Sequence, residues 1–343
     1  MRISRLPEDS CLIKLLFSYT DYPVLLGTAS IFALLITFLL LWKFSRFLPK
    51  DRGRAFASQG DISIGKPTGS GLYFITAYLV SAVIFLPLNT KYVPFYLIIE
   101  ITMLFGFLDD RAKNPWHEYI KGALDLLVSF IAAYVFALTI GNDIIMPIIG
   151  ITLSVPFWLF VVLATMLVWA SINVTNCTDG VDGLSSSLTI ISLISFVLLS
   201  IILGTTNSWF YSLIILIFTL IAYLWFNTNP SKLLMGDAGS RALGIVLALS
   251  ALFSGNPLSY LLICLVFVLD GGAGIAKISL KRFLHISILK KTTTPLHDHF
   301  RERNASVESK KYNWKNQTLT ARFSLVSILI CSLYLFIIYI ALN

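Results

Sequence analysis

Two aspartates that are each followed by glycine make one segment of this chain well suited to binding a polar ligand. Asp179 and Asp182 lie three residues apart in the stretch Asn173-Val-Thr-Asn-Cys-Thr-Asp-Gly-Val-Asp-Gly-Leu184. On a helical turn this spacing places both carboxylates on one face, and the glycines let a ligand approach the backbone closely. Helix capping alone would explain one of the two aspartates, but not both with Asn176 beside them.

A third aspartate, Asp237, lies in the segment Met235-Gly-Asp-Ala-Gly-Ser240, at the predicted start of another helix. A carboxylate there offers a hard oxygen ligand for Mg²⁺, and the free backbone N–H groups beside it suit a phosphate. The segment alone is a moderate signal. Its occurrence together with the other carboxylate motifs strengthens the prediction of a magnesium and phosphate site.

Two adjacent acids, Asp109 and Asp110, end an apolar run in Gly106-Phe-Leu-Asp-Asp-Arg-Ala-Lys113. If the helix continues, Asp109 and Lys113 share one face. A charged helix end that anchors the segment at the lipid headgroups is the alternative. Two adjacent acids near anionic lipid are unfavourable for anchoring alone, so a cation or a proton role is the favoured interpretation.

Two further segments hold groups that can contact phosphate. Gly65-Lys-Pro-Thr-Gly-Ser-Gly71 is a turn of small residues around Lys66, and an ordinary loop is an equally good interpretation of it. Thr294-Pro-Leu-His-Asp-His-Phe300 places two histidines and an aspartate in a strongly basic loop. Because such a loop repels metal and attracts anions, we favour contact with a pyrophosphate over a metal site or plain surface histidines.

The composition places these motifs in a membrane protein. Hydrophobic residues make up 57% of the 343 residues and charged residues 13%, with a mean hydropathy of +0.81, whereas soluble chains carry about 25% charged residues. The net charge of +8 is confined to a few blocks between long apolar runs, so no nucleic-acid partner is expected. We predict an all-α, polytopic integral membrane protein with about ten transmembrane helices. The expected spans are 22–44, 69–87, 92–108, 120–140, 149–170, 184–203, 209–226, 239–254, 257–277 and 322–342.

The distribution of Lys and Arg predicts the orientation. The loops after the odd-numbered spans hold 22 of the 26 Lys and Arg residues, and such loops lie in the cytosol. We therefore expect both termini outside the cytosol and the active-site loops on the cytosolic face. Residues 1–343 form a single integral membrane domain in this prediction, and 277–321 form a long basic cytosolic loop that carries the His-Asp-His motif.

Acidic residues inside the predicted spans need a separate explanation, because a charge at the bilayer centre is costly. Glu100 lies near the middle of a span, Asp125 lies one turn into the next, and Asp270 precedes Gly271-Gly-Ala-Gly274. A proton or ion path and a purely structural role remain equally good interpretations.

Taken in order, these motifs resemble the polyprenyl-phosphate N-acetylhexosamine-1-phosphate transferase superfamily over residues 65–300. The Asp-Gly-Val-Asp-Gly-Leu and Met-Gly-Asp-Ala-Gly-Ser elements carry most of the resemblance. Within the superfamily, the chain is most similar to the bacterial phospho-N-acetylmuramoyl-pentapeptide transferases of peptidoglycan synthesis.

This resemblance implies an Mg²⁺-dependent homodimer in the bacterial plasma membrane. It would transfer phospho-N-acetylmuramoyl-pentapeptide from its UDP derivative to undecaprenyl phosphate, releasing UMP and forming the first lipid-linked peptidoglycan intermediate. Asp237 matches the metal-binding aspartate, and Asp109 and Asp110 match the paired carboxylates near the lipid phosphate. The expected substrate-binding residues are Lys66, Thr68, Lys113, Asn176, Asp179, Asp182, Asn227, His297, Asp298 and His299.

Three positions depart from the family pattern. Asp298 stands in the middle of what is usually a run of three histidines, Lys66 replaces a usual threonine, and Leu234 replaces a phenylalanine that could stack on uracil. A transferase for another UDP-N-acetylhexosamine, such as UDP-N-acetylglucosamine, is one alternative. The other, from a different class, is an ion-coupled secondary transporter that uses Glu100 and Asp270.

Overall fold

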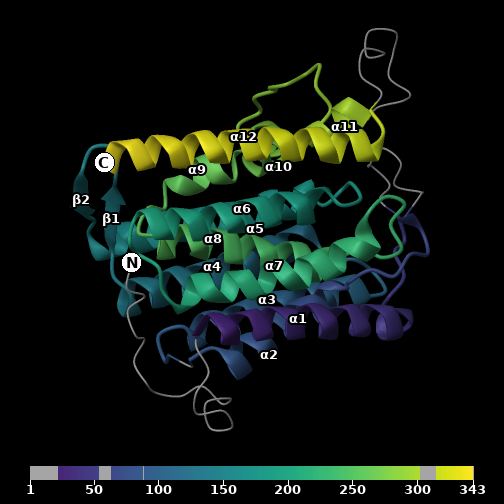
Figure 1. Ribbon diagram of the computed structural model, residues 1–343. Coiled ribbons are helices and arrows are strands. Elements are labelled where there is room, and N and C mark those ends of the chain that lie inside the picture. The colour runs from purple at the N-terminus through teal and green to yellow at the C-terminus, as the bar shows by residue number, and fades with distance from the viewer. Residues whose placement is uncertain (1–21, 54–62, 88, 302–313, 343) are drawn as a thin grey trace.

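Long helices lie side by side and make up most of the molecule (Figure 1). The computed structural model describes residues 22–53, 63–87, 89–301 and 314–342. Ten helices of 15 or more residues occur in this part of the chain: α1 (Tyr22–Phe44), α2 (Gly71–Phe85), α3 (Val93–Arg111), α4 (Glu118–Thr139), α5 (Phe157–Thr178), α6 (Leu184–Ile202), α7 (Ser208–Asn227), α8 (Gly236–Phe253), α10 (Leu265–Phe283) and α12 (Asn316–Leu342). The shorter elements are η2 (Ser45–Phe47), α9 (Ser259–Ile263), α11 (Leu296–Arg301) and the strands β1 (Asp143–Met146) and β2 (Ile151–Ser154).

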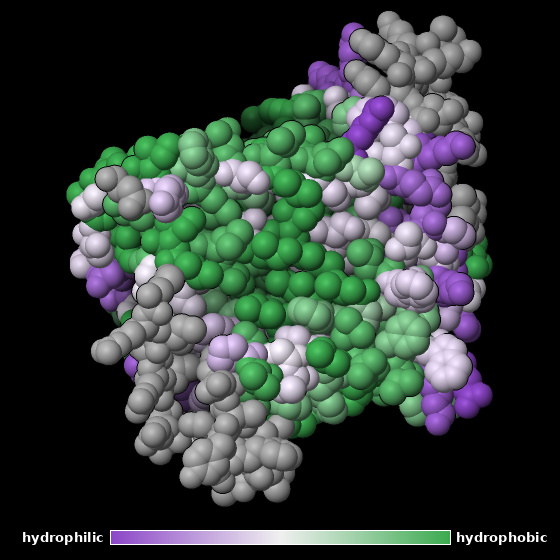
Figure 2. Space-filling model, viewed as in Figure 1, coloured by the Kyte–Doolittle hydropathy of each residue, from purple (hydrophilic) through white to green (hydrophobic). Residues whose placement is uncertain are grey.

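The helices have the length and composition of membrane spans. Seven of those described are long and apolar enough to cross a bilayer, with mean hydropathies from 1.3 to 2.7, and α2 is a shorter apolar helix. Figure 2 shows a broad apolar surface over the middle of the bundle and polar side chains gathered at its end. The prediction of a helical, polytopic membrane protein is therefore confirmed.

The predicted helix 149–170 is wrong at its start, because residues 151–154 pair with 143–146 as an antiparallel hairpin. Pro156 follows at the N-cap of α5, and a proline favours extended backbone in the residue before it. The helix therefore begins at Phe157 and continues to Thr178, which carries Asn176 in its last turn.

The basic region near the C-terminus is also more ordered than a loop. The helix α10 continues to Phe283, α11 lies within the region, and α12 already begins at Asn316. The predicted loop 277–321 therefore includes parts of two long helices. Its residues 302–313 lie outside the described part, as do the residues before 22.

The centre of the bundle is α8, whose residues from Ala238 to Phe253 are all buried. It packs against α2, α3 and α5. Glycines permit this close approach: a Cβ on Gly71 of α2 or on Gly106 of α3 would collide with the α8 backbone, and one on Gly244 would collide with α5. This packing holds the start of α8 among the ends of three other helices.

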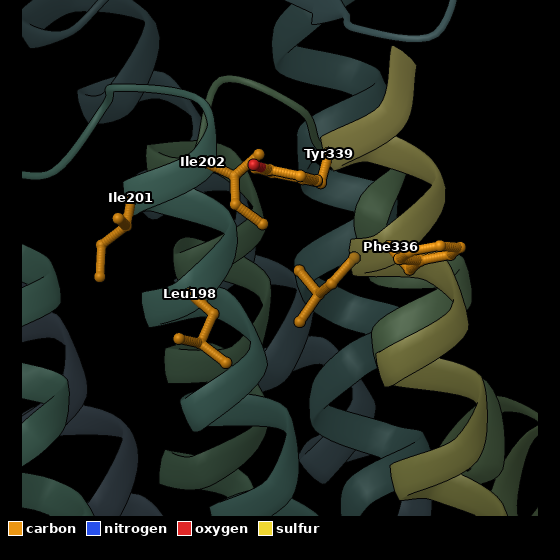
Figure 3. A pocket seen from close by; sticks show the side chains of 6 residues that line it. Leu198, Ile201, Ile202, Phe336 and Tyr339 are labelled. Carbon is orange, nitrogen blue, oxygen red and sulfur yellow. The ribbon is translucent and has the colours of Figure 1, made fainter. Parts of the chain in front are cut away.

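An apolar groove lies between α6 and α12 (Figure 3). It is lined by Leu198, Ile201, Ile202, Leu335, Phe336 and Tyr339. The groove is near the end of α12, on the side of the bundle that carries the β1–β2 hairpin (Figure 1). Because its lining offers almost no polar group, it is not a candidate for phosphate chemistry.

Candidate active site

The N-terminus of α8 is capped by a carboxylate from another helix. Asp110, in the last turn of α3, accepts hydrogen bonds from the backbone N–H groups of Asp237 (3.0 Å) and Ala238 (3.1 Å). Gly236 has a φ of +67°, and a Cβ there would collide with the Asp110 carboxylate. The first N–H groups of a helix have no partner within the helix, and a negative charge beside them is stabilising. Asp110 therefore fixes Asp237 in position relative to α3.

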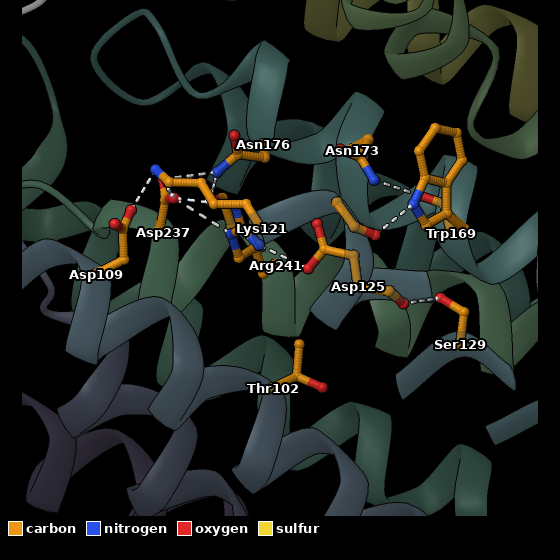
Figure 4. Close-up of polar contacts among 12 residues, drawn as sticks. Thr102, Asp109, Lys121, Asp125, Ser129, Trp169, Asn173, Asn176, Asp237 and Arg241 are labelled. Carbon is orange, nitrogen blue, oxygen red and sulfur yellow. Dashed lines mark hydrogen bonds and ion pairs between the residues drawn. The ribbon is translucent and has the colours of Figure 1, made fainter. Parts of the chain in front are cut away.

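Lys121 connects Asp109 and Asp237 (Figure 4). Its Nζ contacts Oδ2 of Asp109 and lies 3.2 Å from Oδ2 of Asp237. The second oxygen of Asp109 accepts the backbone N–H of Trp116 at 2.7 Å. The side chains of Lys121 and Asp237 remain 23% and 15% exposed. Two carboxylates from different helices thus share one ammonium group that a substrate can reach.

Arg241 and Asn176 complete the surroundings of Asp237. Nε and Nη2 of Arg241 each lie 3.2 Å from Oδ2 of Asp237, and its Nη1 lies 2.6 Å from Oδ1 of Asp125 in α4. Asn176 donates from Nδ2 to Oδ1 of Asp237 and to Oγ of Ser240, both at 2.9 Å. A buried charge that loses its partner is strongly destabilising, so Asp125 and Arg241 hold each other and, through Arg241, hold Asp237.

The structure thus brings Asp109, Asp110, Asn176 and Asp237 together, as the motifs predicted. The helix does not continue as the shared face of Asp109 and Lys113 would require, because α3 ends at Arg111 and the backbone of Ala112 is extended. Lys113 is exposed.

Sequence reasoning missed two cations of this site, Lys121 and Arg241. Arg241 follows Asp237 by four residues on α8 and is detectable as a helical pair. Lys121 contacts carboxylates that are distant in sequence, so no local pattern points to it.

The two aspartates of the Asp-Gly-Val-Asp-Gly segment, residues 179–183, have different surroundings. Asp179 ends α5 and is half-buried, one turn beyond Asn176. Asp182 accepts hydrogen bonds from Nδ2 of Asn229 (2.8 Å) and from the backbone N–H (3.1 Å) and Oγ (2.8 Å) of Ser231. Its carboxylate therefore ties this segment to the loop between α7 and α8.

Asn227 has a similar role as a connector. Its Oδ1 accepts the backbone N–H of Gly183 at 2.9 Å, and its Nδ2 donates to the carbonyl of Leu233 at 3.0 Å. Asn227 is buried, so its amide is directed into the protein.

The turn 65–71 packs beside the same loop. Lys66 donates from Nζ to Oγ of Ser231 at 2.9 Å. Thr68 is buried, and its backbone N–H donates to the carbonyl of Pro49. The half-buried Leu234 pairs its backbone with Pro67 and Ser70, so this turn is held at the start of α8.

The histidine motif forms a separate buried cluster. Oδ1 of Asp270 accepts the backbone N–H of His297 at 2.7 Å, and its Oδ2 lies 2.8 Å from Nδ1 of the same histidine. Arg301 pairs with Asp298 at 2.7 Å and donates to the carbonyl of Gly180 at 3.1 Å. His297 and Asp298 are buried, whereas His299 is half-buried.

The carboxylates near Lys121 are the groups best placed to hold a divalent cation. In the described part of the chain, no three His, Cys, Asp or Glu residues are grouped as a protein-only metal site. Magnesium sites at phosphates commonly need only one or two carboxylates, because substrate oxygens and water complete the shell. Asp109 and Asp237 already share one cation, so their oxygens fit such a site.

Comparisons with known proteins show the family to which this chain is related. Residues 92–255 match the family described as Glycosyl transferase family 4. The chain is 35% identical over 324 residues to the phospho-N-acetylmuramoyl-pentapeptide-transferase of Treponema pallidum, covering 89% of this chain and 87% of that protein. It is 30% identical to the protein of that name from Staphylococcus saprophyticus (79% and 89% covered) and 29% identical to that of Clostridium botulinum (84% and 86% covered). The chain belongs to the phospho-N-acetylmuramoyl-pentapeptide transferase family.

Proposed function

We propose that this protein transfers phospho-N-acetylmuramoyl-pentapeptide from its UDP derivative to undecaprenyl phosphate. An oxygen of the lipid phosphate attacks the sugar-linked phosphorus, the bond from that phosphorus to the bridging oxygen breaks, and UMP leaves with that oxygen. The observation that carries the proposal is the meeting of Asp109, Asp237 and Lys121 in one partly exposed cluster. Similarity over most of the chain to transferases of that name supports it.

The chain's own residues supply charge and alignment, which are the main needs of phosphoryl transfer. Lys121 and Arg241 offset the negative charge of the pyrophosphate at the moment of transfer. Asp109, which faces Lys121, orients the attacking lipid phosphate. Asp110 acts through the backbone of α8, because both of its oxygens are hydrogen-bonded there.

Mg²⁺ is part of this proposal, with Asp237 as its main protein ligand and Asp109 as the second. When bound, it would stabilise negative charge on the pyrophosphate and on departing UMP. Lys121 lies between these two carboxylates and holds them close together.

The remaining residues of the predicted site are assigned roles according to their exposure and their contacts. Lys66 and Asp179 are half-buried and are the proposed contacts to the UDP-sugar. His299 and the exposed Lys113 are proposed to contact phosphate groups. Thr68, Asp182, Asn227, His297 and Asp298 are proposed to act mainly by holding the loops that carry the others.

The orientation and assembly of the protein also belong to the proposal. Both termini are expected outside the cytosol of a bacterium, because the basic loops lie at the end of the bundle that carries the site. This places the site where cytosolic UDP-sugars and the lipid phosphate of the inner leaflet meet. A homodimer is the expected assembly in the plasma membrane.

The test is UMP release by the purified protein in detergent with undecaprenyl phosphate and one of two donors. UDP-N-acetylmuramoyl-pentapeptide should give Mg²⁺-dependent UMP release that EDTA abolishes and added Mg²⁺ restores. UDP-N-acetylglucosamine should give little. The reverse preference would assign the chain to the other UDP-sugar, and ion-coupled uptake by proteoliposomes without UMP release would indicate a transporter.

A further inference from the structure

A buried acid–histidine pair formed by Asp270 and His297 lies beside the loop that follows α5, and the proposed transfer chemistry does not use its side chains directly. Asp270 lies in the second turn of α10, and His297 lies at the start of α11. Their side chains are 1% and 2% exposed, and their nearest polar atoms are 2.8 Å apart. A substrate cannot reach either group directly, so any effect on the reaction must pass through what His297 touches.

His297 touches the loop that follows α5. A Cβ built on Gly180 would collide with Nε2 of His297, so the ring lies directly against this glycine. Arg301, one turn later, donates to the carbonyl of the same Gly180. Two side chains of α11 therefore hold one residue, which lies between Asp179 and the rest of the loop.

The two oxygens of Asp270 have different partners, and this fixes the proton on the histidine ring. Oδ1 accepts the backbone N–H of His297, a donor that cannot change its role. Oδ2 lies 2.8 Å from Nδ1, and since a carboxylate oxygen accepts hydrogen bonds, this pairing gives the donor role to Nδ1. Nε2, at the other side of the ring, faces Gly180 and lies 3.8 Å from Oδ1 of Asp298.

We infer that Asp270 is a positioning residue of the transfer reaction, acting through His297 on the Asp179–Gly180 segment. This inference rests on the proposed function. It assigns to Asp270 the task of setting the tautomer and orientation of His297, so that Asp179 and Asn176 keep their positions around the UDP-sugar and Asp237.

Asp270→Asn is the decisive variant because it preserves the shape of the side chain. Its amide oxygen must still face the backbone N–H of His297, so its NH₂ group faces Nδ1. The proton of the imidazole then moves to Nε2, as in Asp-to-Asn changes of serine-protease triads. The pair keeps two hydrogen bonds, but Nε2, which still faces Gly180, now carries the proton.

The expected kinetic effect is specific for one substrate. We expect kcat/KM for the UDP-sugar to fall by about 10- to 100-fold, because small displacements at a site have effects of this size. The KM for undecaprenyl phosphate should stay within about twofold, because the phosphate-orienting Asp109 lies on α3. Asp143→Asn, the same change on the β1–β2 hairpin, is the matched control and should leave both constants unchanged.

A nitrogen-15 NMR spectrum of histidine-labelled protein tests the pairing of Asp270 with His297 independently of activity. The chain has four histidines, and a His297→Gln sample identifies the relevant signals. We expect Nδ1 of His297 to be protonated in the unaltered protein and unprotonated in Asp270→Asn. When Asp270→Asn and His297→Gln are combined, the fall in kcat/KM should be no larger than in His297→Gln alone. The effects of residues that act through one another are not additive.

Gly180→Ala tests the same contact from the loop side if Asp270→Asn does not fold. The added methyl group must displace His297 or the loop, so the same fall in kcat/KM for the UDP-sugar is expected. Gly272→Ala on α10 is the control, because a Cβ there meets only ordinary contacts at 3.6 Å and beyond.

The outcomes separate the two claims. Unaltered protein that releases no UMP from either UDP-sugar would contradict the proposed function. Unaltered protein that turns over normally while a folded Asp270→Asn or Gly180→Ala variant keeps its kcat/KM would contradict this inference alone. An unchanged His297 tautomer in Asp270→Asn would also overturn it.

Discussion

Two charged networks lie near each other in this protein and differ in what they can do. The Asp237 network consists of Asp109, Lys121, Asp125, Asp237 and Arg241. The Asp270 network consists of Asp270, His297, Asp298 and Arg301. Both join several elements through ion pairs. Only the first includes charged side chains that are substantially exposed, at Lys121 and Asp237.

The difference in exposure separates binding from positioning. In the Asp237 network, Lys121 is shared between two carboxylates, so an anionic substrate can take over part of its charge. In the Asp270 network, both oxygens of Asp270 are matched to donors within the protein. Groups of the same chemical kind are therefore proposed to contact the substrate in the Asp237 network and to hold the protein in the Asp270 network.

Of the variants in the two networks, Asp237→Asn should reduce turnover most. The change removes the carboxylate shared by Lys121, Arg241 and Asn176, together with the proposed magnesium ligand. We expect UMP release to fall by about 10³-fold or more, the upper range for loss of a group that stabilises developing charge. The protein should still elute as a single species with an unchanged helical circular dichroism spectrum. Near-normal turnover would remove Asp237 from the proposed site.

Lys121→Met should have the next largest effect. Without the ammonium group, Asp109 and Asp237 repel each other, and one of the charges that offsets the pyrophosphate is lost. We expect kcat to fall by about 10²-fold. Lys232→Met, an exposed lysine in the loop before α8, is the matched control and should behave like the unaltered protein. Equal effects of the two variants would mean that only overall surface charge matters.

The sequence predicted part of each network: it pointed to Asp109 and Asp237 but not to Lys121 and Arg241, and to His297 and Asp298 but not to Arg301. Asp109, Asp110, Asn176 and Asp237 belong to short motifs whose residue types already indicate cation and phosphate chemistry. These residues come together because glycines such as Gly106 allow other helices to approach α8 closely. The ten apolar runs predicted most of the helices that carry them.

What the sequence did not predict are contacts between distant segments and the local choice between helix and strand. Lys121 reaches Asp237 across 116 residues, and the partner of Asp270 is 27 residues away. The apolar run before Pro156 fits a helix or a strand equally well. It became a hairpin only because a second strand, 143–146, was available to pair with it.

Asp125→Asn tests how far the Asp237 network extends into the protein. Arg241 would lose a buried charged partner at 2.6 Å while keeping Asp237. Because Asp237 and the amide oxygen of the variant still accept from Arg241, the loss should be smaller than the roughly 3 to 5 kcal/mol of a fully broken buried pair, and we expect a modestly lower midpoint of thermal unfolding. Turnover should fall only by about tenfold, because Asp125 does not face the substrate. A loss as large as that of Asp237→Asn would place Asp125 among the groups that contact substrate.

Glu100→Gln should have the smallest effect on turnover. Glu100 belongs to neither network, so this variant tests whether a buried acid elsewhere in the bundle takes part in function. Oε1 of Glu100 accepts a hydrogen bond from Oγ1 of Thr76 at 3.3 Å, and Oε2 is buried without a hydrogen-bond partner in the described residues. An amide keeps this contact and removes a charge that is costly within the bilayer. We therefore expect full UMP release and an equal or higher thermal midpoint. If Glu100 instead carried coupled ions, Glu100→Gln would abolish function while Asp237→Asn retained it, which is the opposite order of effects.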